Sequence, residues 1–196
     1  MNFVQVCNKG NMLLEVDKDT REYRLTYDML DLKRLNIGEF LSFKIYELIQ
    51  RLNPDLIEDI QIIKKHSEDE IDVFFKFKNI AKELGMAQRC MILKTQRIIN
   101  NIDPQNVKVE FKSKSINKED CDQTFLKDID ISKFSVLNCK FADTFITING
   151  SNISMQYNFL ILMNEELPQY MENMIGLMMK KIFYNVKKFI DKIEEK

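Results

Sequence analysis

Residues 145–190 read FITINGSNISMQYNFLILMNEELPQYMENMIGLMMKKIFYNVKKFI and contain the strongest structural signals of the chain. Alternation of apolar and polar residues predicts two strands joined at Asn149-Gly150, a dipeptide typical of hairpin turns. From Pro168 onward the apolar residues recur every three or four positions, which predicts one uninterrupted helix over residues 167–193. A helix of about 28 residues is ~42 Å long, so it can cover much of a sheet.

The predicted helix is amphipathic, and its two faces suggest two different roles. Its apolar stripe consists of Leu167, Met171, Met174, Ile175, Met178, Ile182, Val186, Phe189, Ile190 and Ile193. We expect Met171, Met174, Met178 and Ile182 to face the sheet. Five lysines form a candidate membrane or partner surface: Lys180, Lys181, Lys187, Lys188 and Lys192. We expect Lys181, Lys188 and Lys192 to face water. The alternative is that these lysines are only the ordinary solvated face of the helix.

Upstream of this stretch the sequence predicts mostly strands. Residues 1–16 form a predicted hairpin, and residues 21–27 alternate, with Tyr23, Leu25 and Tyr27 on one face. A helix is predicted between residues 36 and 52, where Asn53-Pro54 ends it, followed by a hairpin over residues 57–78 and a strand at 106–111. Three strands are expected within residues 133–163, the last with one shared face: Ile153, Met155, Tyr157, Phe159, Ile161 and Met163.

Two segments give weaker signals. Residues 80–101 fit a helix through Ile80 and Leu84, and they also fit a strand that starts near Gly85 with Ala87, Met91 and Leu93 inward. The strand is favoured, although the helix propensities of Ala, Glu, Leu and Lys point the other way. Residues 115–132 are polar and acidic, which predicts a long exposed loop.

The bulk composition predicts one globular domain and excludes some functions. The chain has 196 residues and a net charge of -1, so it lacks the basic surplus typical of nucleic-acid binding. Cys7, Cys90, Cys121 and Cys139 stand far apart, which predicts reduced thiols and no metal site. No signal peptide or membrane span is predicted, so we expect a cytoplasmic protein with at most peripheral membrane contact.

The order of predicted elements resembles the START-like, or helix-grip, superfamily of lipid-transfer domains and polyketide cyclases. YELIQRLNPDLIEDIQIIKKHSEDEIDVFFKFK resembles its passage from early helices through Asn-Pro into the first hairpin. GSNISMQYNFLILMNEELPQYMENMIGLMMKKIFYNVKKFI resembles its last strand, Leu-Pro junction and final helix. The resemblance implies an α+β fold in which a curved antiparallel sheet grips a long C-terminal amphipathic helix. The domain would span residues 21–196, with residues 1–20 as a hairpin extension.

We find no catalytic motif. His66 is the single histidine and falls in a predicted polar loop, and glycine-rich phosphate loops are missing. The acids around Cys121 do not match a calcium loop, and they are expected to raise the pKa of this exposed thiol. An enzyme with a cyclase-like pocket would have to use Tyr157, Asn158 or Asp143 as its polar groups.

The sequence therefore favours non-enzymatic binding of a lipid or another hydrophobic small molecule between sheet and helix, with no cofactor, metal or nucleic acid. Its predicted ligand contacts are Met171, Met174, Ile175, Met178, Ile182, Tyr157 and Phe159. The alternative is a protein-interaction or scaffold module with a solid core and no ligand.

Overall fold

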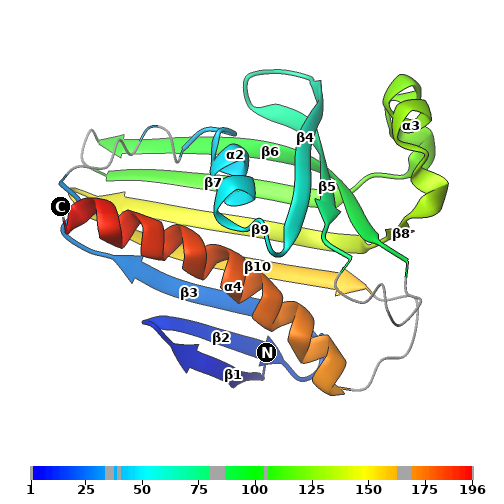
Figure 1. The fold of residues 1–196 in the computed structure, drawn as a ribbon. Helices are drawn as coiled ribbons and strands as arrows, with labels where there is room; N and C mark the ends of the chain where they lie inside the picture. Colours follow the sequence, from blue (N-terminus) through cyan, green and yellow to red (C-terminus); the bar gives the residue numbers. More distant parts are fainter. Residues whose placement is uncertain are drawn as a thin grey trace.

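The computed structural model describes residues 2–33, 38, 41–79, 87–103, 106–162 and 169–195. Within these residues one antiparallel sheet curves around helix α4, which crosses its inner face, while the short helix α2 lies beside α4 (Figure 1). The strands are β1 Phe3–Lys9, β2 Met12–Asp17, β3 Tyr23–Met29, β4 Ile57–Lys65, β5 Glu70–Phe77, β6 Arg89–Asp103, β7 Asn106–Ser115, β8 Ser135–Val136, β9 Asn138–Asn149 and β10 Asn152–Leu162. The helices are α2 Ile45–Leu52, α3 Gln123–Ile129 and α4 Gln169–Glu194.

The sheet has the strand order β1-β2-β3-β10-β9-β7-β6-β5-β4, and β8 pairs with β6 in parallel. Its first hairpin turns at Gly10 and Asn11, whose φ angles of 64° and 55° match the primed turns that tight hairpins favour. Because β2 pairs with β3 and Met12 and Leu14 are fully buried, this hairpin continues the main sheet. The division of the chain at residue 20 stays a prediction.

The alternating faces predicted for the strands are confirmed. Tyr23, Leu25 and Tyr27 are buried on the inner face, as are Ile153 and Tyr157. The predicted hairpin over residues 57–78 is β4 with β5. Helix α2 ends before Asn53 as expected, but it begins only at Ile45, because residues 41–44 form turns. The last two of the three strands expected within residues 133–163 are β9 and β10, whereas the first is only the short β8, because β9 begins at Asn138. Met163 lies outside the described residues.

The ambiguous segment is a strand over its described part, as favoured. In β6, Met91 and Leu93 point inward and are buried. Ala87 is exposed, contrary to expectation, because it precedes the strand and takes no part in its alternation. Ile80, Leu84 and Gly85 lie outside the described residues.

The prediction of an exposed loop over residues 115–132 is wrong. This segment forms α3 and two short 3-10 turns, which cover the outer face of β5 and β6. Phe74 and Ile92 point outward from those strands and need an apolar cover, which Phe125 and Ile131 help to supply. Cys121 is consequently buried, and burial is the main cause of its raised pKa, with Asp72 and Asp120 adding to it.

Helix α4 runs without a break through Gly176, as predicted, but its rotation differs from the prediction. Met174 is 59% exposed, whereas Met179 is buried in the main core. The reason is close contact at Gly176, where a Cβ atom would stand 2.6 Å from Cε1 of Tyr23. Contact through Gly176 turns Ile175 and Met179 inward and leaves Met174 on the outer side of the helix.

The prediction that Lys180 belongs to a membrane or partner surface is wrong, because this residue is only 6% exposed. Its ammonium donates to the carbonyl oxygen of Met12 at 2.7 Å and lies 3.3 Å from Sγ of Cys7. A lysine can be buried in this way because its long apolar stem packs along the helix while its ammonium reaches backbone acceptors. Lys180 thus joins α4 to the first hairpin.

Candidate functional site

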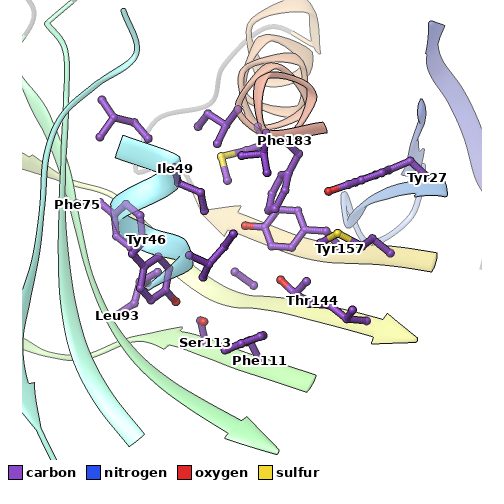
Figure 2. Close-up of a pocket in the computed structure, with 18 of the residues that line it drawn as sticks. Tyr27, Tyr46, Ile49, Phe75, Leu93, Phe111, Ser113, Thr144, Tyr157 and Phe183 are labelled. Atoms are coloured by element: carbon purple, nitrogen blue, oxygen red, sulfur yellow. The ribbon is translucent and has the colours of Figure 1, made fainter. Parts of the chain in front are cut away.

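A cavity of about 100 Å³ lies between the inner face of the sheet, α2 and the C-terminal half of α4. Figure 2 shows side chains from these three parts converging on it, with Phe183 above, Tyr46 and Ile49 on one side and Tyr27 on the other. Its lining from the helices is Ile45, Tyr46, Ile49, Met179, Ile182, Phe183, Val186 and Ile190. Its lining from the sheet includes Tyr27, Met29, Phe75, Phe77, Met91, Leu93, Phe111, Ser113, Ala142, Thr144, Ile146, Ile153, Met155 and Tyr157.

Asn53 connects α2 and α4, the two helices that line the cavity, through hydrogen bonds. It is fully buried, and its amide nitrogen donates to the carbonyl oxygens of Ile49 in α2 at 2.9 Å and of Ile182 in α4 at 3.4 Å. Asn185 in turn donates to Oδ1 of Asn53 at 2.8 Å. The sequence predicted only that Asn53 ends α2; its role as a link between helices depends on tertiary contacts.

The cavity wall is apolar apart from five hydroxyl groups, those of Tyr27, Tyr46, Ser113, Thr144 and Tyr157. Among the described residues that line the cavity, none carries a charge. Burial raises the pKa of Tyr27, Tyr46 and Tyr157, so each phenol keeps its proton at neutral pH. The site therefore offers hydrophobic contact and neutral hydrogen-bonding groups.

Two of the predicted ligand contacts, Ile182 and Tyr157, line the cavity. Ile175 is buried and Met178 packs against the main core, but neither lines the cavity, and Phe159 is fully buried between other rings. Met174 faces away from the sheet, and the side chain of Met171 lies outside the described part of the structure. As a set of ligand contacts these residues stay a prediction.

The inner core is solid under the N-terminal half of α4 because rings fill the space there. Phe159 stacks on Tyr23 with ring centroids 5.2 Å apart and on Tyr157 at 4.9 Å, while Gly176 brings the helix down onto Tyr23. Farther along the sheet the inward side chains become small, as at Ala142 and Ser113, and the space opens. Small inward residues among large ones are the sequence signal that marks this position.

The lysine surface of α4 is smaller than predicted. Lys181, Lys188 and Lys192 face water as expected. Lys181 pairs with Asp55, and the largely buried Lys187 pairs with Asp191 at 2.8 Å. Among the described helices none is both long and apolar enough to span a membrane.

The groups considered for catalysis are not gathered in the cavity. Asp143 and Asn158 alternate with inward residues and so point to the opposite sheet face from Tyr157. His66 is exposed in the loop between β4 and β5, as expected, and its Nε2 lies 2.8 Å from Oδ2 of the buried Asp72 on the outer face. The described residues include no cluster of three or more side chains suited to holding a metal ion.

No family model matches the sequence, and no curated protein sequence matches it either. Solved structures do match its fold. Human STARD10 is 10% identical with a TM-score of 0.68 over 97% of this chain and 74% of that one. Human StAR-related lipid transfer protein 5 is 11% identical, with a TM-score of 0.66 over 97% and 87% of the two chains.

A fragment of a STAR-related lipid transfer protein from Xanthomonas axonopodis is 7% identical, with a TM-score of 0.62 over 97% and 99% of the two chains. Sequence identities this low leave the fold as the property that these proteins share with the chain. The agreement extends over nearly the whole chain and includes the sheet and its long C-terminal helix. The chain therefore has the START-like, helix-grip fold that its sequence resembles.

Proposed function

We propose that this protein binds a lipid or another hydrophobic small molecule in the cavity beneath α4, without changing it chemically. The observation that carries the proposal is the apolar wall of that cavity, which the described residues line without a charge. Each Å² of apolar surface that a ligand buries in the cavity contributes about 25 cal/mol to the free energy of binding. Pockets that are mostly apolar with a few polar groups are the usual form of small-molecule sites.

The size of the cavity limits what fits without rearrangement. A volume of about 100 Å³ is below the roughly 150 Å³ of an engineered apolar cavity that takes up benzene. A short stretch of acyl chain is therefore the largest group expected to enter the present shape, and a single ring requires a slight adjustment of the side chains around it. A larger ligand would require movement of Met155, Met179 or Phe183, and methionine side chains adapt readily to such changes.

The comparisons support the same proposal at the level of fold. The similar structures include proteins named for lipid transfer, and they share the arrangement of sheet and final helix. Because one fold can host many functions, the cavity itself remains the stronger argument. A scaffold with a solid core, the alternative reading of the sequence, would not need an apolar void at this place.

The experiment is a titration with toluene, observed through ¹³C-methyl labels on methionine. Met29, Met91, Met155 and Met179 line the cavity, and exposed Met174 serves as an internal control. We expect the signals of the four cavity methyls to shift saturably while that of Met174 stays in place. Equal shifts for Met174, or none for the cavity methyls, would contradict the proposal.

A matched pair of variants separates cavity binding from general stickiness. Ala142→Leu fills the cavity and should abolish the toluene shifts, whereas Ala87→Leu adds the same atoms at an exposed position and should leave them intact. Native mass spectrometry of freshly purified protein, before and after denaturing extraction, would then identify any co-purifying hydrophobic compound.

A further inference from the structure

The hydroxyl of Tyr27 is an unusual feature of the cavity wall. Within the described part of the chain its Oη is enclosed and has no hydrogen-bond partner, although the residue is only 4% exposed. Figure 2 shows this hydroxyl directed toward Tyr157 and Phe183, on the side of the cavity opposite α2. A buried polar group without a partner costs free energy, so such groups call for an explanation.

Two of the other lining hydroxyls, those of Tyr46 and Ser113, are hydrogen-bonded through Thr95. The hydroxyl of Tyr46 donates to Oγ1 of Thr95 at 3.3 Å, and Thr95 shares a second hydrogen bond of 2.9 Å with Ser113. These hydrogen bonds are complete without a ligand. Tyr27 lies on the other side, and a phenylalanine would fill its place equally well if the ring alone mattered.

The charge of the cavity wall restricts the partner that Tyr27 can have. Because none of the described lining residues is charged, a carboxylate or ammonium group of a ligand would be buried without a counter-ion. Burial raises the pKa of Tyr27, so its hydroxyl is protonated and able to donate. A carbonyl or hydroxyl oxygen is the group that matches such a donor without bringing charge.

We propose that the ligand of this cavity is an uncharged apolar molecule with a hydroxyl or carbonyl oxygen, and that Tyr27 binds this oxygen through its hydroxyl. The inference rests on the proposed function and adds the chemical class of the ligand and the residue that selects it. Since Oη is enclosed, the ligand reaches it when a flexible neighbour such as Met155 or Met179 moves aside.

Three one-ring probes of similar size test this proposal: phenol, toluene and benzoate. Affinities are measured by the methionine methyl titration in the parent protein and in Tyr27→Phe. One net hydrogen bond corresponds to about three- to tenfold in affinity. We expect Tyr27→Phe to weaken phenol binding by that factor and not to weaken toluene binding, and we expect benzoate to bind more weakly than phenol to the parent protein.

Tyr184→Phe is the control, since it removes a tyrosine hydroxyl from a partly exposed side chain of α4 that lies against Gly10 of the first hairpin and does not line the cavity, so it should change neither affinity. A measurement without mutation supplements it: the ¹³Cζ signal of Tyr27 should move with phenol and stay in place with toluene.

The possible outcomes distinguish this inference from the proposed function. If phenol and toluene both bind and Tyr27→Phe alters neither, or if benzoate binds as tightly as phenol, the inference is overturned and the cavity remains a general apolar site. If none of the probes shifts the cavity methyls of the parent protein, the proposed function fails first.

Discussion

Ala142→Leu should stabilise the ligand-free protein, because its three additional carbons enter existing empty space. Ala142 is buried on β9 and faces the cavity of about 100 Å³, roughly three times the ~30 Å³ that one water occupies in the liquid. Burial of three carbons contributes about 2.4 kcal/mol, from which ordering the leucine side chain removes about 0.5–1 kcal/mol.

The expected gain in the free energy of unfolding is thus about 1.5–2 kcal/mol, which for a chain of this size raises Tm by roughly 3–8 °C. Urea unfolding and thermal scans measure it on protein stripped of bound compounds, since a ligand in the parent protein would stabilise that protein by mass action and hide the gain. Ala87→Leu, at an exposed position, should stay within about 0.5 kcal/mol of the parent.

A loss of stability on Ala142→Leu would contradict the presence of empty space beside Ala142. If neighbouring side chains already fill the space, leucine must push them from their rotamers at a cost of about 1–3 kcal/mol. The sign of the change in the free energy of unfolding therefore distinguishes a protein with a cavity from one with a close-packed core.

Three further predictions concern single side chains. Tyr27→Phe removes an unpartnered buried hydroxyl, so the free energy of unfolding in urea should stay the same or rise by about 1 kcal/mol; a large loss would mean that this hydroxyl has a structural partner. Gly176→Ala should destabilise by about 1 kcal/mol in the same assay, because the clash with Tyr23 outweighs the helix propensity gained. Hydrogen bonds to its carboxylate lower the pKa of buried Asp17 below the ordinary 3.8, and the bond from the Thr20 amide has the largest effect. The ionised carboxylate therefore stabilises the fold above pH 3.8, and this stabilisation is lost as the pH falls through the pKa of the folded state. Asp17→Asn should therefore lower stability at pH 7 and flatten the acid limb of a stability-versus-pH curve, and an unchanged acid limb would contradict this assignment.

The sequence determined the elements whose periodicity is local. Alternation around Leu25 and Ile153 predicted strands with the correct inner face, and the repeat along residues 167–193 predicted one continuous helix. The Asn-Pro stop after α2 was readable as well. These signals suffice because each strand or helix needs only one apolar face to be recognised, and the order of such elements limits the fold to few arrangements.

Three placements required knowledge of the neighbours. Residues 115–132 read as a loop by composition, yet they fold over Phe74 because an apolar outer face of β5 must be covered. On α4, Met174 and Met179 are equally apolar, and close contact between Gly176 and Tyr23 decides which of them is buried. Lys180 is buried because carbonyl oxygens of the first hairpin happen to lie within its reach.

The candidate site depended on tertiary structure most of all. Tyr157 and Ile182 were identified from the sequence, whereas Tyr27, Tyr46 and Ala142 contact the same space from three other elements. Periodicity reports which way a side chain points, but a void depends on how the volumes of many inward side chains add up across the sheet and two helices. The sequence therefore determined that a long helix lies against a curved sheet, and only the packing between them decided where the cavity lies and which side chains line it.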